Sequence, residues 1–366
     1  MKVSPAFSAM RETDDYSMDE GGREGPKEVS QHADVQVSKV LFPNNDPSTV
    51  LWLGQTQGRC IGLWRRDFEA RTSFDPFRVV SVKNVDVDPM DACSCAPNIS
   101  CVSFLDGSLA VLNTKNDDIS LVKKIESIHD GCESRAVCTA SSNGNLERVD
   151  LETGQSTTVV TGQSGLRSVC TAPGGHLVFT GSSTGQLGIW DLRQANDEGQ
   201  CTAYNILVPS KKPLDGVTAL CSHPAQSNLL CCGTNEGLIG FIDIRNGADA
   251  VISGTYVLSP KTITQVSFHP SSPDNLLCSS ADGSLLRLDA TAVTSAAVNG
   301  QSRSNVWLTG SELAHSLRIE PLRNAAQSSV TSFACQGDVI VASTSLGVIH
   351  SYEKLPFFPA LTSTFA

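Results

Sequence analysis

Three closely spaced cysteines come nearest to a metal site in this chain. They are Cys93, Cys95 and Cys101. A structural zinc ion usually takes four ligands arranged in two pairs, and no second pair is evident at a suitable spacing. The sequence shows no evident nucleophile elbow and no His-Glu-x-x-His helix. It also shows no glycine-rich, phosphate-binding loop that leads into a helix. The sequence therefore predicts no metal, no cofactor and no catalytic residues, so an enzyme is not expected.

Two histidines each precede a proline, as His223-Pro224 and His269-Pro270. Proline lacks a backbone donor and has a fixed φ, so it ends a strand. Neither histidine has another ligand residue at metal spacing. We therefore predict that both are turn residues.

Two Asp-x-Arg sequences suggest a different kind of chemistry, ion pairing. Arg193 follows Trp190-Asp191, and Arg245 follows Ile242-Asp243. In one interpretation each arginine pairs with the aspartate of its own segment. In the other, both arginines contact a partner protein.

The segments that carry these residues repeat. Six times, a glycine is followed two residues later by Leu or Ile and five residues later by an apolar residue, which usually precedes Asp. The glycines are Gly107, Gly144, Gly185, Gly237, Gly283 and Gly347, and the closing pairs are Leu112-Asn113, Val149-Asp150, Trp190-Asp191, Ile242-Asp243, Leu288-Asp289 and Tyr352-Glu353. Self-similarity of this kind indicates a WD-type β-propeller.

Each repeat predicts two strands joined by a tight turn. The Asp282-Gly283 pair between two apolar runs is the clearest turn signal, because glycine tolerates the positive φ that such a turn needs. Trp190, Ile242 and Leu288, with the aspartates that follow them, are predicted blade-core residues. A less regular hairpin over 50–65 adds a seventh unit, so we predict an all-β, seven-bladed propeller over 34–366.

Two stretches, 194–215 and 291–327, are rich in small and polar residues and are predicted as surface loops. Trp307 lies in the second. It either anchors that loop to the ring or contacts a partner.

The first 33 residues are acidic and contain few apolar residues, so we predict a disordered tail. Val35–Phe42 is the first strand-like run. Part of it is expected to complete the last blade and close the ring, which would remove both free sheet edges.

The net charge is −11, which argues against a nucleic-acid surface because phosphate binding needs clustered Lys and Arg. No apolar run is long enough to span a membrane, and no secretory signal is evident. The 13 cysteines are an odd number, and many fall within predicted strands, so we expect a reducing compartment and no disulfides.

The order of the repeats resembles one family. The segments Gly185–Gln194, Gly237–Arg245 and Phe268–Ala290, followed by a polar loop and a last blade without Trp-Asp, resemble the small WD-repeat nucleoporins called nucleoporin forty-three. The resemblance covers roughly half of the chain, from about Arg167 to Tyr352.

This resemblance implies a non-catalytic scaffold in the Y-shaped outer-ring complex of the nuclear pore. Such a protein docks onto an α-solenoid nucleoporin at the nuclear envelope and accompanies the complex to kinetochores in mitosis. The resemblance implies no chemistry. We also expect no nucleic-acid partner, no direct membrane insertion and no obligate homo-oligomer. The rival hypothesis comes from Arg193 and Arg245, whose Asp-x-Arg boxes look like those of substrate receptors of cullin-type ubiquitin ligases.

Overall fold

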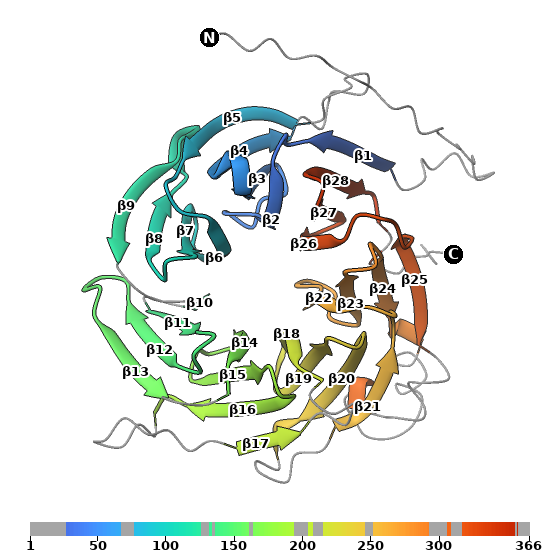
Figure 1. The fold of residues 1–366 in the computed structure, drawn as a ribbon. Helices are drawn as coiled ribbons and strands as arrows, with labels where there is room; N and C mark the ends of the chain where they lie inside the picture. The colour runs from blue at the N-terminus through green and yellow to red at the C-terminus, as the bar shows by residue number, and fades with distance from the viewer. Residues whose placement is uncertain are drawn as a thin grey trace, which may run out of the picture.

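The computed structural model describes most of the chain. The described residues are 27–66, 77–125, 132–133, 136–160, 164–193, 204–207, 215–245, 252–292, 306–308, 317–355 and 357. Within them the strands form seven four-stranded antiparallel sheets, arranged as blades around a central axis (Figure 1). The predicted all-β, seven-bladed propeller is confirmed.

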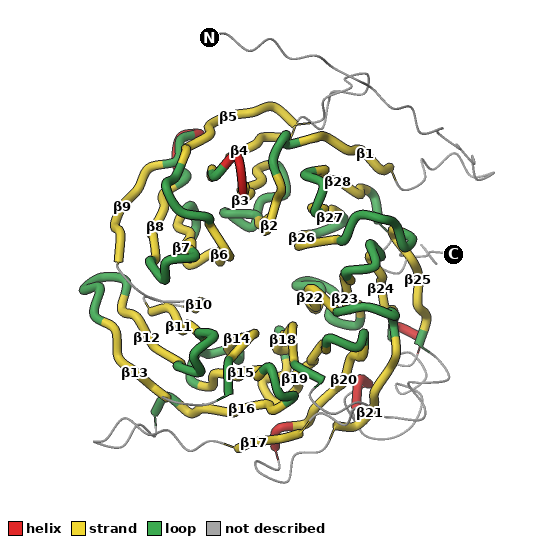
Figure 2. Tube along the Cα trace, in the orientation of Figure 1, coloured by secondary structure: helices red, strands yellow, loops and turns green. Residues whose placement is uncertain are grey.

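Each blade runs from an innermost strand at the axis to an outermost strand at the rim (Figure 2). In chain order the blades are β2 (Gln36–Leu41), β3 (Thr49–Gln55), β4 (Cys60–Arg66), β5 (Phe77–Asn84); β6 (Pro89–Ala96), β7 (Ile99–Phe104), β8 (Leu109–Asn113), β9 (Ser120–Ile125); β10 (Cys132–Glu133), β11 (Ala136–Ala140), β12 (Leu146–Asp150), β13 (Ser156–Val160); β14 (Leu166–Thr171), β15 (Leu177–Ser182), β16 (Gln186–Asp191), β17 (Tyr204–Leu207); β18 (Val217–His223), β19 (Gln226–Thr234), β20 (Leu238–Asp243), β21 (Ile252–Val257); β22 (Ile263–Phe268), β23 (Asn275–Ser280), β24 (Leu285–Asp289), β25 (Arg318–Arg323); and β26 (Val330–Gln336), β27 (Val339–Thr344), β28 (Val348–Glu353), completed by β1 (Lys27–His32). Short 3-10 turns occur at η1 (Thr56–Gly58), η2 (Lys115–Asp117) and η4 (Val306–Leu308).

The ring closes through a strand that precedes the predicted one. β1 pairs antiparallel with β28 from Lys27↔Glu353 to His32↔Val348, so it is the outermost strand of the last blade. The run predicted to close the ring instead forms β2, the innermost strand of the first blade. The prediction of a disordered tail is therefore wrong for residues 27–32, and residues 1–26 lie outside the described part of the chain. The segment KEVSQH has no clear apolar alternation, and the free edge of β28 decides its pairing.

An inter-blade contact supports this closure. Arg66, at the end of β4, is buried and forms an ion pair with Glu353 of β28. Its Nη1 also donates a hydrogen bond to Ser351 Oγ at 2.5 Å, and its guanidinium lies 5.9 Å from the centre of the Phe77 ring. Burial lowers the pKa of Arg66 to about 10. The first and last blades are thus joined by a charge pair as well as by apolar packing.

The repeated turn glycines all adopt left-handed backbone conformations. The φ angles of Gly107, Gly144, Gly185, Gly237, Gly283 and Gly347 lie between 76° and 93°. Each turn joins the second and third strands of its blade, so all six turns lie on the same face of the ring. We call this face the turn face.

The repeated apolar-Asp pairs divide into a packing residue and a turn residue. Trp190, Ile242 and Leu288 are buried between blades. Their aspartates are only half-buried, and Oδ1 of each accepts the backbone N–H two residues later, at 3.0 Å for Asp191 and Asp243 and at 2.9 Å for Asp289. The aspartates predicted as blade core therefore shape the turn that leaves the third strand, because an Asx turn needs a short acceptor at its first position.

Both predicted surface loops contain the outermost strand of a blade. Tyr204–Leu207 forms β17 within 194–215, and Arg318–Arg323 forms β25 within 291–327. Pro321 is tolerated in β25 because a rim strand has one unpaired edge. No residue of β25 is buried, so its sequence carries weak periodicity. The two loop predictions are wrong at these positions.

We expect Gly283 to be far less tolerant of substitution than Gly337. Both have positive φ, at 93° and 60°. A Cβ at Gly283 would lie 2.6 Å from the Ser328 carbonyl oxygen and 2.8 Å from Ala326 backbone atoms, whereas one at Gly337 would meet nothing within 4 Å. Gly337→Ala should cost about 1–2 kcal/mol from backbone strain, and Gly283→Ala about 2–5 kcal/mol because overpacking adds to that strain. Urea unfolding of the two variants measures the difference, and equal losses would contradict the assigned turn.

Candidate docking surfaces

The two Asp-x-Arg sequences form matching ion pairs in neighbouring blades. Arg193 Nε and Nη2 donate to the Asp191 carboxylate at 2.9 and 2.7 Å. Arg245 engages Asp243 in the same bidentate manner through Nε and Nη2. The local-pairing interpretation thus describes the observed geometry, and hydrogen bonding from Arg193 lowers the pKa of Asp191 to about 2.

Both arginines remain open to solvent despite these pairs. The side chains of Arg193 and Arg245 are 63% and 67% exposed. They follow the third strands of successive blades, so they lie on the face opposite the turn face. An exposed, pre-oriented guanidinium is able to meet a partner while keeping its own carboxylate.

Trp307 anchors its segment to the ring. Its side chain is only 2% exposed, and its ring lies 4.9 Å from Phe241 and 5.6 Å from Phe268 between ring centres. The indole Nε1 donates to the Pro273 carbonyl at 3.1 Å. The alternative that Trp307 contacts a partner is therefore wrong, since its surface is already covered.

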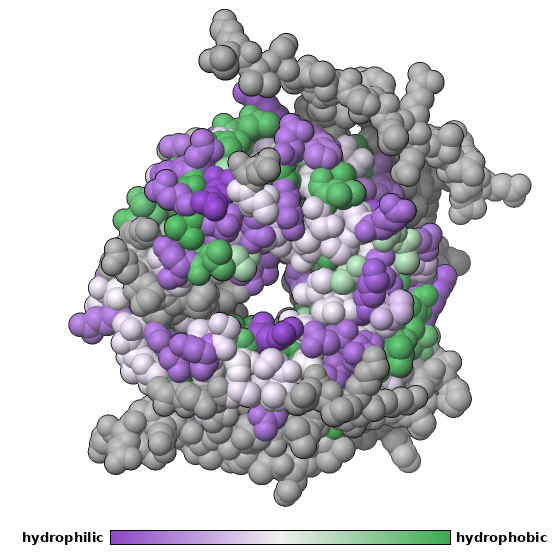
Figure 3. Space-filling view, viewed as in Figure 1, coloured by the Kyte–Doolittle hydropathy of each residue, from purple (hydrophilic) through white to green (hydrophobic). Residues whose placement is uncertain are grey.

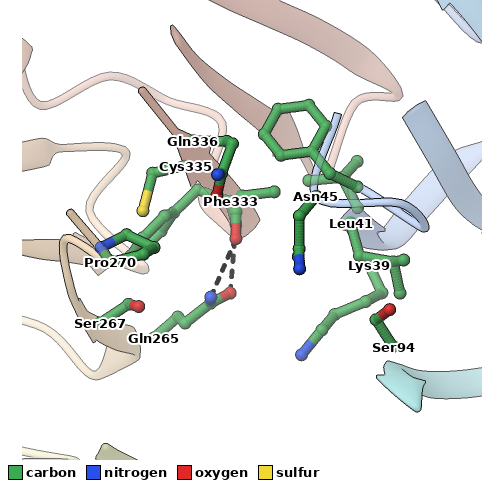
Figure 4. Close-up of a pocket in the computed structure, with 13 residues that line it drawn as sticks. Lys39, Leu41, Asn45, Ser94, Gln265, Ser267, Pro270, Phe333, Cys335 and Gln336 are labelled. Atoms are coloured by element: carbon green, nitrogen blue, oxygen red, sulfur yellow. Dashed lines mark hydrogen bonds between the residues drawn. The ribbon is translucent and has the colours of Figure 1, made fainter. Parts of the chain in front are cut away.

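A small open pocket of about 240 Å³ is lined by parts of four innermost strands, β2, β6, β22 and β26. Lys39 and Asn45 face Gln265 and Gln336 across it (Figure 4). The Lys39 ammonium is 2.6 Å from Asp91, and Gln265 bonds the Phe333 carbonyl at 2.9 Å. This volume is below the roughly 300–1,000 Å³ of typical small-molecule sites, so it suits a single side chain.

The three clustered cysteines lie on adjacent strands of one blade. Cys93 pairs with Cys101 between β6 and β7, and Cys95 Sγ is 3.1 Å from Cys101 Sγ. No group of three or more His, Cys, Asp or Glu residues in the described ranges is arranged to hold a metal ion. The absence of metal and disulfides stays a prediction for the chain as a whole.

The two His-Pro histidines are part of turns. His223 Nδ1 accepts a hydrogen bond from Ala225 N at 3.2 Å, and His269 Nδ1 accepts one from Ser272 N at 3.0 Å. Burial lowers the pKa of His223 to about 4 and also lowers that of His269. Both imidazoles are therefore neutral at physiological pH and serve as turn acceptors.

The prediction that no Gly-x-Ser-x-Gly motif is present is wrong, although the segment that carries the motif lacks the structure of a nucleophile elbow. Residues 181–185 read Gly-Ser-Ser-Thr-Gly. They form the end of β15 and the turn into β16, a strand-to-strand connection, whereas a nucleophile elbow joins a strand to a helix. This segment therefore has no elbow geometry.

The fold defines the class, a seven-bladed WD-type β-propeller. In the described part of the chain, no helix has the length and apolar character needed to span a membrane.

Comparisons with known proteins narrow this class. Residues 129–307 match the family model for the N-terminal domain of Nucleolar protein 10-like proteins. The chain is 27% identical to Nucleoporin Nup43 of Mus musculus over 248 residues, which cover 61% of this chain and 63% of that protein. It is 34% identical to Nucleoporin Nup43 of Homo sapiens over 114 residues, or 31% and 28% of the two chains. The matched region is thus less than two thirds of either relative, and the resemblance predicted from the repeat order is confirmed.

Proposed function

We propose that this protein is a non-catalytic scaffold subunit of the outer-ring complex of the nuclear pore. The observation that carries the proposal is its similarity to Nucleoporin Nup43 of two mammals. The propeller fold supports it, because such rings present broad, rigid surfaces for other proteins. The acidic net charge of −11 supports protein rather than nucleic-acid partners.

In this proposal the propeller docks onto an α-solenoid nucleoporin and resides at the nuclear envelope. Kinetochore association in mitosis is part of the same proposal, because a subunit of the outer-ring complex would accompany that complex to kinetochores. The test is to tag the full chain at its native expression level, image interphase cells and identify co-purified subunits. We expect a nuclear rim signal and co-purified nucleoporins. A diffuse signal without pore subunits would reject the proposal.

A second candidate, a substrate receptor of a cullin-type ubiquitin ligase, rests on the exposed Arg193 and Arg245. The double variant Arg193→Gln and Arg245→Gln separates the two candidates, since it removes both guanidinium charges at positions that are mostly solvent-exposed. Under the scaffold proposal the folded double variant keeps its rim signal. Under the receptor proposal it loses a co-purifying ligase adaptor by about tenfold or more, as expected for arginine hot spots.

A further inference from the structure

Large apolar side chains are exposed on the turn face at two turns, one on each side of the β2–β5 blade. Leu105 precedes Gly107 in the β6–β9 blade, and Leu346 precedes Gly347 in the last blade. Their exposed fractions are 61% and 65%. The equivalent turns of the other four repeats carry polar residues, including Ser142, Thr184, Glu236 and Asp282. An exposed leucine at a loop tip is not required by the turn, whose geometry the glycine provides.

The β2–β5 blade lies between these two turns, and its own second-to-third-strand turn exposes the polar residues Thr56 and Arg59. Val35 packs against this turn, so closely that a Cβ on Gly58 would lie 2.2 Å from a Val35 methyl group. On the other side, Gln55 Nε2 lies 3.5 Å from the sulfur of Met90, which is 40% exposed. We call the set Val35, Met90, Leu105 and Leu346 the apolar strip. Figure 3 shows separate apolar patches over these blades, with hydrophilic surface between and around them.

Backbone hydrogen bonds hold the strip in place. Leu105 N donates to the Asp88 carbonyl at 2.9 Å, and Ala33 N donates to the Gly347 carbonyl at 2.7 Å. The Asp88 carboxylate accepts Thr56 N at 3.0 Å and Arg59 Nε at 3.2 Å. Because turns from adjacent blades are bonded to one another, the strip needs little reorganisation on binding.

The edges of the strip are acidic. Asp34, Asp86 and Asp106 are exposed beside it. Of the cations near them, Arg59 is paired with Asp88 and Lys83 is exposed on the outermost strand β5. A partner that covers the strip should therefore carry basic side chains around an apolar centre. Strand addition does not suit this face, because the unpaired strand edges of a propeller lie at the rim and along the central channel.

We propose that the apolar strip docks an amphipathic α-helix with an apolar face flanked by Lys or Arg. This inference rests on the proposed function, since a solenoid nucleoporin presents helices, and it assigns the docking to the turn face near the seam between the first and last blades. The leucines insert between helix side chains, and the aspartates fix the orientation.

The test compares two variants with the same added charge. Leu105→Asp with Leu346→Asp places charge in the strip, whereas Ser142→Asp with Asn143→Asp places it at the equivalent turn of the β10–β13 blade. Thermal melts first verify that both fold. Each variant is made in the full-length chain and purified from cells. The amount of pore subunits that co-purify should fall about tenfold or more for the strip variant only. A photo-crosslinking residue at 105 should capture a helical, Lys- or Arg-rich segment, and one at 142 should not.

The outcomes separate this inference from the proposed function. Loss of pore subunits by the strip variant, with a helix captured from a nucleoporin, supports both. A captured helix of the expected chemistry from another protein, which no longer co-purifies with the strip variant, supports the strip and rejects the pore proposal. If the strip variant keeps its pore subunits, the strip is overturned and the pore proposal stands. Capture of a second copy of this chain, or of an extended segment, also overturns it.

Discussion

Deletion of residues 1–33 is expected to open the ring, whereas deletion of residues 1–26 should leave it closed. The longer deletion removes β1, which leaves the edge of β28 unpaired along the whole register from Val348 to Glu353. It also removes Gln31, whose side-chain oxygen accepts Phe77 N at 3.0 Å, and Glu28, which lies 3.1 Å from His350 Nδ1. The expected loss is several kcal/mol, a large share of the roughly 5–15 kcal/mol that stabilises a typical domain.

Thermal denaturation followed by circular dichroism measures this difference. The shorter deletion is the matched control, because it removes the acidic segment and keeps every described strand. Size-exclusion chromatography should show self-association only for the longer deletion, since a free strand edge pairs with other chains. A peptide of residues 27–33 added in trans should restore part of the melting temperature. Identical melts for the two deletions would show that β1 does not close the ring.

Trp190→Ala is expected to destabilise the protein by about 3–5 kcal/mol, as large truncations in a core do. Trp190 is 3% exposed and packs with Val178 of its own blade and Leu146 of the preceding one. Its indole Nε1 donates to Thr180 Oγ1 at 2.8 Å. Neighbouring Gly188 leaves room for the ring, since a Cβ there would lie 2.7 Å from the indole nitrogen. The substitution thus removes packing at a blade interface together with a buried hydrogen bond.

Two controls divide that loss into its parts. Trp190→Phe keeps most of the ring volume and should cost less than the alanine variant. Thr180→Val removes the acceptor and leaves the indole N–H unpaired, at a cost of about 1–3 kcal/mol. Chemical unfolding measures the loss in the free energy of unfolding for each of the three variants, Trp190→Ala, Trp190→Phe and Thr180→Val. A Trp190→Ala protein as stable as the unmodified chain would place the indole outside the blade interface.

The repeated turns were predictable because they are local. A glycine with positive φ, an apolar residue at a fixed offset and an aspartate that accepts the N–H two residues later each act within a few residues, so their spacing alone indicates the blade. The six regular repeats and the hairpin over 50–65 led to the correct blade number. The Asp-x-Arg pairs were likewise visible, since Arg193 and Asp191 are two residues apart.

Tertiary structure decided what depends on distant neighbours. β1 is a strand because β28 presents a free edge to it, although its own sequence has little strand character. The strands β17 and β25 exist because the third strand of each blade pairs with an outer partner. No residue of β25 is buried, so that strand carries no apolar pattern. Trp307 is a core residue because its ring packs against Phe241 and Phe268, which lie in two adjacent blades. The turn that carries Leu346 adjoins the first blade only because closure brings the last blade beside it. Sequence spacing does not encode a contact made by closing a ring.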